Sequence, residues 1–257
     1  MKLTLENDGR RYSFQTEKGM DLSISMNPNG PRAWYVEPMR IEPVRTEQFL
    51  GSVAEGGAVN FRDVYFNPHG HGTHTENVGH IIDTDVPVVK SVGSSHYMAK
   101  LVTVELMKQD AMQGVSQGAS QGDWVVNEES LMGMDLNVEA LIIRTKPNDH
   151  SKTNRQYSGT NFPYFTLGAM QLIVDAGVQH LLVDLPSVDR EEDGGALVAH
   201  HLFWNVPAEP NFQKTITELI YVPNEIADGN YVLNLQVSNF ANDAAPSRPM
   251  LFDLMEE

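Results

Sequence analysis

Cysteine is absent from the 257-residue chain. Its absence excludes disulfides, thiolate metal ligands and a cysteine nucleophile, so any metal chemistry falls to histidine and carboxylate side chains. Positive charge is scarce, because 18 Lys and Arg residues face 34 Asp and Glu residues, a net charge of −16. That balance repels phosphate backbones and anionic lipid surfaces, so we expect neither nucleic acid nor a membrane as a partner.

Two further features are missing. No apolar run reaches the length of about 18 residues that spans a bilayer, and no GxSxG elbow of a serine hydrolase occurs. The first residues, MKLTLENDGRRYSFQ, show neither the apolar core nor the cleavage site of a secretory signal, which predicts a cytoplasmic location. With 41% hydrophobic residues and no linker-like segment, we expect one domain over residues 1–257.

Potential metal ligands are concentrated in residues 67–82, NPHGHGTHTENVGHII, which contain four of the nine histidines. They are His69, His71, His74 and His80, and Glu76 lies between the last two. Glycines at positions 70, 72 and 79 disfavour a helix and allow close approach of the backbone to a ligand. Imidazoles and a carboxylate in such a loop indicate a divalent metal site, whereas a single histidine would indicate only a solvated polar loop.

Periodicity predicts an α/β fold with a mixed central sheet, few helices and long loops. The order of strand 138–145, helix 166–176 and strand 180–185 predicts a parallel pair with a right-handed crossover. Thr166 is a plausible N-cap of the helix and Gly177 a plausible stop. The other expected elements are a hairpin in residues 3–14, strands at 21–26, 56–66, 98–107, 215–222, 231–240 and 249–254, a helix at 195–204 and a surface loop at 109–121.

A strand and a helix carry further candidate ligands. Glu218 interrupts an apolar, β-branched run, and a carboxylate there is costly to bury unless it is paired or bound to metal. His200 and His201 are adjacent in the expected helix and point about 100° apart, so that one of them can face a site while the other does not. The segment that follows, NVPAEPNFQ, contains two prolines and is expected to form a surface excursion.

Gly72, Thr73, His74, Glu76 and His80 resemble the HxGTHxDxPxH signature of the cyclase family. This family of metal-dependent hydrolases includes bacterial kynurenine formamidase and isatin hydrolase. Further stretches resemble the family over most of the chain. The sequence departs from the signature at Gly70, where the family has its first histidine, and has Glu76 for Asp and Val78 for Pro.

The resemblance implies a swivelling β/β/α arrangement, a homodimer or homotetramer, and a site for one or two metal ions, Zn²⁺ first and Mn²⁺ as the alternative. Glu76 is suited to bridge two ions. His80 matches the catalytic histidine, its alternative role being to support a ligand. The ligand set is expected to be His69, His74, Glu76, His200 and Glu218, with His71 as the substitute for His69.

Aromatic residues are candidates for the substrate wall. Trp34, Phe66 and Trp204 fit a hydrophobic wall around an aromatic substrate, although each is also a natural core residue. Asp21, Asp63 and Asp83 are candidates to orient the imidazoles, and nothing in the sequence selects among them.

The resemblance implies hydrolysis of a small-molecule amide by metal-activated water. N-formylkynurenine, which yields kynurenine and formate in tryptophan catabolism, is one expected substrate, and isatin-like cyclic amides are another. The alternative is a binding module that retains the fold without the metal. Replacement of the first histidine by Gly70 and the lengthened segment after His200 favour that alternative, whereas the survival of the other ligands opposes it.

Overall fold

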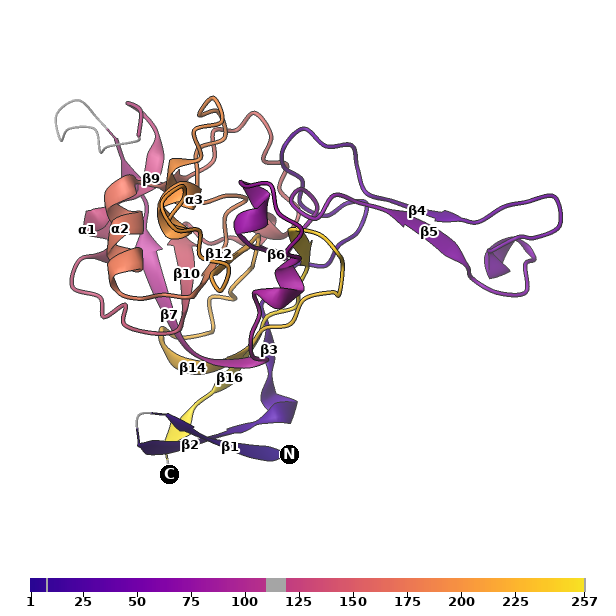
Figure 1. Ribbon diagram of the computed structural model, residues 1–257. Coiled ribbons are helices and arrows are strands. Elements are labelled where there is room, and N and C mark those ends of the chain that lie inside the picture. The colour runs from indigo at the N-terminus through magenta and orange to yellow at the C-terminus, as the bar shows by residue number, and fades with distance from the viewer. Residues whose placement is uncertain (8, 110–118, 257) are drawn as a thin grey trace.

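The computed structural model describes residues 1–7, 9–109 and 119–256 (Figure 1). The described residues form a nine-stranded mixed sheet, which confirms the α/β class and the mixed direction of the central sheet. Its four middle strands are mutually parallel, and the strands outside them pair antiparallel. In order across the sheet the strands are β15 (Ala244–Pro246), β6 (His74–Glu76), β13 (Thr215–Glu218), β12 (His180–Val183), β10 (Ala140–Lys146), β7 (His96–Glu105), β14 (Gly229–Asn234), β16 (Met250–Asp253) and β3 (Met20–Asp21).

Helices cover one face of the sheet (Figure 1). They are α1 (Glu128–Leu131), α2 (Leu167–Asp175) and α3 (Val198–Phe203). Along β10, Leu141 and Ile143 pack into the core beneath the helices, and Ile142 faces a second core on the other side. Both faces of the parallel strands are thus buried, which is why their sequences read as continuous apolar runs.

The unit β10–α2–β12 agrees with the sequence prediction. β10 and β12 are parallel neighbours, and α2 connects them. The Thr166 side chain accepts a hydrogen bond from the backbone N–H of Ala169 (3.2 Å), so Thr166 is the N-cap of α2. Gly177 ends the helical segment with a φ of +80°, a conformation that glycine adopts without strain.

Two three-stranded sheets accompany the main one in the described part of the chain. The predicted hairpin is confirmed as β1 (Lys2–Asn7) and β2 (Arg10–Gln15), which β17 (Met255–Glu256) extends. The other small sheet contains β8 (Met107–Lys108), β9 (Trp124–Val126) and β11 (Tyr164–Phe165). The surface loop predicted at 109–121 falls largely on residues 110–118, outside the described part of the chain. Among the described residues, no helix has the length and apolar character needed to cross a membrane.

The strand predicted at 21–26 is shorter than expected. β3 ends at Asp21, and an isolated bridge joins Ser23 to Ile220. The Asp21 carboxylate accepts hydrogen bonds from both the backbone N–H (2.9 Å) and the hydroxyl (2.6 Å) of Ser23. Such local side-chain bonds compete with the sheet ladder and end the strand.

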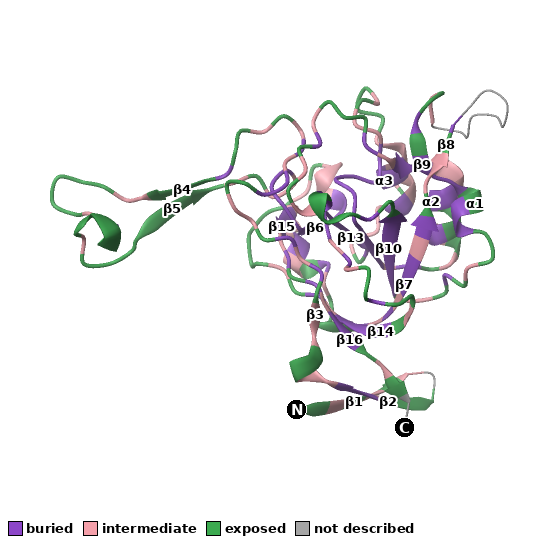
Figure 2. Cartoon of the chain, turned by 180° about the vertical axis from the view of Figure 1, so that it is seen from behind, coloured by how far each residue is buried: buried purple, intermediate pink, exposed green. Residues whose placement is uncertain are grey.

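A two-stranded arm extends from the body of the protein (Figures 1 and 2). It consists of β4 (Arg40–Pro43) and β5 (Arg62–Tyr65), which pair antiparallel. Every residue of β5 is exposed, and so are the first three of β4. The strand predicted at 56–66 therefore forms only over its last part, and it lies outside the main sheet.

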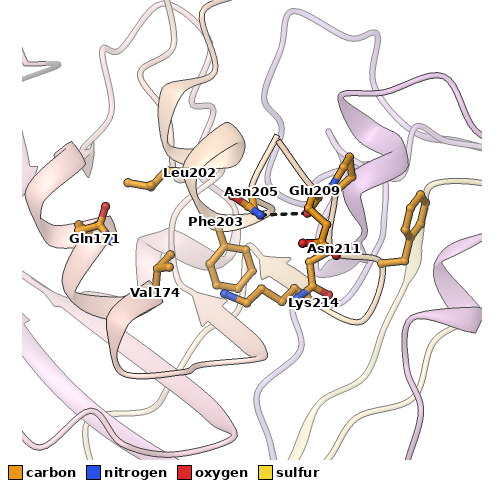
Figure 3. Close-up of a pocket in the computed structure, with 10 residues that line it drawn as sticks. Gln171, Val174, Leu202, Phe203, Asn205, Glu209, Asn211 and Lys214 are labelled. Carbon is orange, nitrogen blue, oxygen red and sulfur yellow. Dashed lines mark hydrogen bonds between the residues drawn. The ribbon is translucent and has the colours of Figure 1, made fainter. Parts of the chain in front are cut away.

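The connection from α3 to β13 folds back on the helix that precedes it. Asn205, with a φ of +57°, donates a side-chain hydrogen bond to the carbonyl of Glu209 (3.1 Å; Figure 3). The indole N–H of Trp204 donates to the carbonyl of Lys214 (3.1 Å). The excursion predicted for this segment is thus fastened at both ends, and it forms a pocket wall beside α3.

Candidate metal centre

Three parts of the chain meet near one edge of the main sheet. β6 carries His74 and Glu76, both fully buried, and pairs antiparallel with β13 so that His74 lies opposite Glu218. The loop before β6 supplies His69, and the short 3₁₀ helix η3 (Val78–His80) after it supplies His80. Helix α3 adds His200. The six residues expected to hold the metal or do the chemistry therefore lie together.

Glu76 lies at the middle of the cluster. Its Oε2 is 3.0 Å from His69 Nδ1, and its Oε1 is 3.1 Å from His200 Nε2. His80 Nδ1 lies 3.9 Å from Oε2. The two carboxylate oxygens thus face imidazoles from different segments, and the same carboxylate belongs to two of the residue groups that are close enough to share a metal ion.

The His74 ring is held in one orientation. Its Nδ1 donates to the carbonyl of Gly72 (3.0 Å), so Nε2 carries the lone pair of the neutral ring and points toward Glu218, 3.5 Å from Oε2. His74 Nε2 and Glu76 Oε2 are both buried, and neither makes a well-aligned hydrogen bond among the described residues, although Oε2 lies 3.0 Å from His69 Nδ1. Buried polar atoms without partners are rare and costly. A divalent cation fits both atoms, since it binds imidazole nitrogen and carboxylate oxygen.

Electrostatics within the cluster favours bound positive charge. Burial lowers the pKa of His69, but its contacts with Asp243 and Glu76 outweigh burial and raise the pKa to about 10. The pKa of His200 is also raised, since Asp189 and Glu76 overcome the effect of burial. Burial and the charge of Glu76 raise the pKa of Glu218. The carboxylates of this site therefore attract positive charge, as expected of a metal centre.

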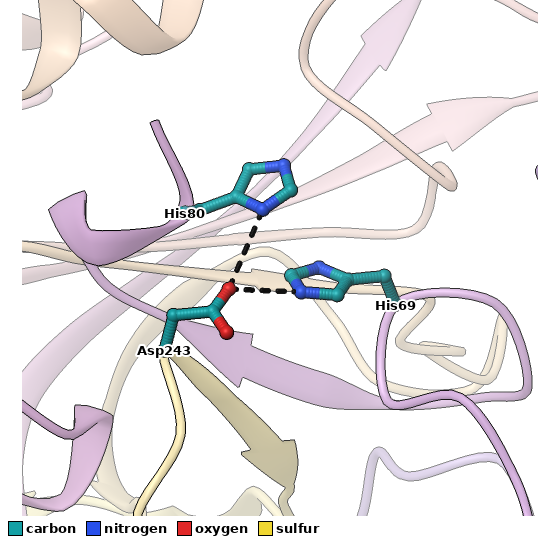
Figure 4. Close-up of side chains that lie close together, drawn as sticks. All are labelled: His69, His80 and Asp243. Carbon is teal, nitrogen blue, oxygen red and sulfur yellow. Dashed lines mark hydrogen bonds and ion pairs between the residues drawn. The ribbon is translucent and has the colours of Figure 1, made fainter. Parts of the chain in front are cut away.

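Two aspartates that the sequence reasoning did not select support the imidazoles. Asp189 accepts a hydrogen bond from His200 Nδ1 (2.6 Å) and two more from the backbone N–H groups of Ala199 (2.8 Å) and His200 (3.0 Å). Asp243 lies 3.0 Å from His69 Nε2 and 3.5 Å from His80 Nδ1 (Figure 4). No local sequence pattern marks either aspartate, because Asp189 lies well before the first residue of α3 and Asp243 is far in sequence from its histidine partners.

The aspartates proposed from the sequence lie elsewhere. Asp21 binds Ser23 and Arg248, the latter at 2.7 Å. Asp63 lies on the exposed strand β5, and Asp83 is exposed at the surface. The expectation that one of these three orients an imidazole is therefore wrong, because none of them contacts a histidine of the cluster among the described residues.

The structure distinguishes His69 from His71, and His200 from His201, as members of the cluster. His71 Nδ1 accepts from the backbone N–H of Asn67 (2.7 Å) and Nε2 donates to the carbonyl of Glu37 (2.7 Å), so both ring nitrogens fasten the loop. His69 instead faces Glu76. On α3, His200 enters the cluster, whereas the half-buried His201 lies outside the groups of potential ligands found among the described residues.

A cavity of about 270 Å³ opens onto the cluster. It is lined by Trp34, Asn67, His69, His80, Ser187, Leu197, His200 and Glu218. Trp34 packs edge-on against Phe162, with ring centroids 5.5 Å apart. The other two expected wall residues lie outside the lining: Phe66 packs near Phe240, and Trp204 is fully buried in the core with its ring 5.3 Å from that of His200.

Comparisons with known proteins find a family and several similar folds. The model of a family described as "Putative cyclase" matches residues 20–190. A search of curated proteins finds no match. Several solved structures share the fold at low sequence identity. One, described as a potential metal-dependent hydrolase with cyclase activity, has a TM-score of 0.61 at 15% identity and covers 92% of this chain and 98% of its own.

Two isatin hydrolases are also similar in fold. An isatin hydrolase bound to the product analogue thioisatinate has a TM-score of 0.60 at 11% identity, over 92% of each chain. Isatin hydrolase A from Ralstonia solanacearum has a TM-score of 0.60 at 14% identity, over 93% of this chain and 92% of its own. At such identities the likeness concerns the fold, and the substrate has to be argued from the site.

Proposed function

The chain belongs to the cyclase family, and we propose that it is a metal-dependent hydrolase that cleaves an amide bond of a small molecule. The observation that carries this proposal is the pair of buried atoms His74 Nε2 and Glu76 Oε2, which make no well-aligned hydrogen bond within the described part of the chain and lie beside Glu218 and His69. Both face a cluster of imidazoles and carboxylates at the edge of a cavity. A site of this kind is costly to a fold unless it binds a cation.

The proposed ligands are His69, His74, Glu76, His200 and Glu218. Imidazole and carboxylate without sulfur suit Zn²⁺, and Mn²⁺ is the alternative. Glu76 is proposed as a carboxylate shared between two ions, because its two oxygens face different imidazoles. A divalent cation bound there lowers the pKa of water and polarises a carbonyl oxygen.

His80 is proposed as the residue that moves the proton. It lines the cavity, and its side chain is 30% exposed. One ring nitrogen faces Asp243, and the other points away from it (Figure 4). An imidazole held in this way is able to take a proton from water and deliver it to the leaving nitrogen, the two tasks of amide hydrolysis.

The proposed substrate is a small aromatic amide. The cavity of about 270 Å³ is small, and Trp34 and Leu197 give it apolar walls. Isatin-type cyclic amides fit this description, and the likeness to isatin hydrolases supports them. N-formylkynurenine, an open-chain aromatic formamide, is the second candidate substrate, and kynurenine formamidase is the corresponding activity.

For the whole chain we propose a single domain over residues 1–257, in the swivelling β/β/α arrangement, that assembles as a homodimer or homotetramer. The support for assembly is the projecting β4–β5 arm, which exposes apolar side chains on both strands, among them Ile41 and Val64. Exposed apolar surface of this kind marks contact sites for other chains.

Elemental analysis of the purified protein tests the proposed centre. We expect about one or two equivalents of Zn or Mn per chain, and loss of metal in His74→Ala, Glu218→Ala and His200→Ala. The matched control is His201→Ala, which alters the neighbouring histidine of the same helix and should retain metal. A wild-type protein that stays metal-free after incubation with Zn²⁺ and Mn²⁺ would instead favour a metal-free binding module.

The reaction is tested separately. The metal-loaded protein should open isatin or release formate from N-formylkynurenine, and His80→Ala should lose most of this activity while keeping its metal. A loss of metal in His80→Ala would show that His80 acts as a ligand or supports one. Absence of hydrolysis of every formyl amide and lactam tested, with metal bound, would refute the amide hydrolase.

A further inference from the structure

Lys214 is a buried cation without an acidic partner. The residue is 7% exposed, and its ammonium lies 4.6 Å from the centroid of the Phe203 ring. Among the described residues its ammonium makes neither a hydrogen bond nor a salt bridge. Lys152, at 3% exposed, contrasts with it, because its ammonium donates to Asp184 (2.7 Å) and twice to Thr145.

The Lys214 side chain borders a pocket of about 630 Å³ between α2, α3 and the connection that follows α3 (Figure 3). That volume lies in the range of small-molecule sites. Val174, Leu202 and Phe212 supply apolar walls, and Gln171, Asn205 and Asn211 supply amide groups. The other charged residue of the lining, Glu209, is exposed and forms no salt bridge with Lys214 among the described residues.

These features define the chemistry of a fitting ligand. Burial of the Lys214 side chain lowers the pKa of its ammonium. An anion in the pocket would stabilise the charged form of this ammonium. One cation in a chain of net charge −16 suits an anion with a single negative charge rather than a phosphate with two. The lining is largely polar, and its apolar side chains accommodate a short hydrocarbon body beside side-chain amides that offer N–H donors to carboxylate oxygens.

We infer that this pocket binds a small apolar monocarboxylate, whose carboxylate pairs with the Lys214 ammonium. The site is separate from the metal centre, although both use α3. His200 faces the metal cluster, whereas Leu202 and Phe203 line the pocket. The inference is independent of the reaction proposed above.

Calorimetric titration of the full chain with benzoate, phenylacetate and hexanoate tests the inference, with benzamide as the neutral match of benzoate. We expect saturable binding of at least one carboxylate, weakened about tenfold or more in Lys214→Met and absent with benzamide. Lys214→Met keeps the aliphatic stem and removes an unpaired buried charge, so it should fold. The matched control is Lys90→Met, at an exposed lysine, which should bind as the wild type does.

His74→Ala separates the two sites. Carboxylates are also able to bind at the metal centre, and binding there would be lost in His74→Ala. Binding in the Lys214 pocket should survive that substitution. The inference is overturned if none of the three carboxylates binds saturably, if Lys214→Met binds as tightly as the wild type, or if His74→Ala abolishes the binding.

Discussion

Asp189 performs two tasks with one carboxylate. It accepts from His200 Nδ1 (2.6 Å), and it also accepts from two backbone N–H groups at the start of α3. An aspartate in this position fixes both the place of the ring and the direction of Nε2, which faces Glu76. We therefore regard Asp189 as a positioning residue of the proposed metal centre.

Asp189→Asn should weaken metal binding about 10- to 100-fold with a small change in melting temperature. The amide oxygen still accepts from the backbone, whereas it holds the His200 ring less firmly. Competition with a chelator measures the affinity, and Asp193→Asn is the control, since Asp193 accepts from the backbone of Gly195 and Leu197 in the same segment. Equal metal affinity in wild type and Asp189→Asn would show that this aspartate serves the helix alone.

His180 makes stability depend on pH. It is buried on β12, bonded through Nδ1 to the Thr215 hydroxyl (2.8 Å), and burial lowers its pKa to about 4. Between that value and the ordinary pKa of about 6.5 the unfolded chain binds a proton that the folded chain does not. The free energy of unfolding is therefore undiminished above the ordinary pKa of histidine. It decreases as the pH falls, by about 2 kcal/mol from pH 7 to pH 5.

Urea unfolding at pH 7 and pH 5 checks this expectation. His180→Gln has no titrating ring, so its free energy of unfolding should fall less over that interval than the free energy of the wild type. His150→Gln, at an exposed histidine, is the control and should behave as the wild type. Equal losses in His180→Gln and the wild type would mean that His180 does not titrate in the way its burial implies.

The expected metal ligands were easier to predict from the sequence than the residues that hold them in position. His74, Glu76 and His80 are close in sequence, and the resemblance to a family placed His200 and Glu218 beside them. The choice between His69 and His71 required the structure, because only the fold shows that Asn67 and Glu37 occupy both nitrogens of His71. Asp243 is 174 residues from its partner His69, and no local pattern encodes such a contact.

Among elements, those determined by local signals were predicted well. The helix at 166–176 has a capping threonine, an apolar face and a terminal glycine, and α2 forms within those limits. The strand predicted at 56–66 shows the limit of such reasoning. The segment was expected to form a strand that leads into the histidine loop, yet β5 covers only its last part, pairs with β4 and has exposed side chains.

The α2 cap gives a prediction at the scale of one element. The Thr166 hydroxyl accepts from the Ala169 N–H and donates to Glu128 of α1 (3.1 Å), so it also ties the two helices together. Thr166→Ala should cost about 1–2 kcal/mol in the free energy of unfolding. Thr166→Ser retains the hydroxyl and should recover most of that loss. Chemical denaturation distinguishes the two, and equal stability of both variants would contradict the role of the cap.

At the scale of the whole molecule, the arm is difficult to explain in a single chain. A two-stranded hairpin alone is marginally stable in water. This one is exposed along most of its length (Figure 2), and its exposed residues include several large apolar ones. The exposed apolar residues of the arm are Ile41, Phe49, Val53, Val59, Phe61, Val64 and Tyr65. Contact with a second copy of the chain would bury this surface and stabilise the hairpin.

The cross-strand pair of Ile41 and Val64 tests this assembly. Changing both to threonine keeps the strand propensity and removes apolar surface, so light scattering after gel filtration should show a shift from a dimer or tetramer toward the single chain. The adjacent pair, Glu42 and Asp63, is the control, because changing both to threonine alters the same hairpin without removing apolar side chains. A wild-type protein that elutes as a single chain, or an unchanged mass after the Ile41 and Val64 substitutions, would show that the arm does not hold the copies together.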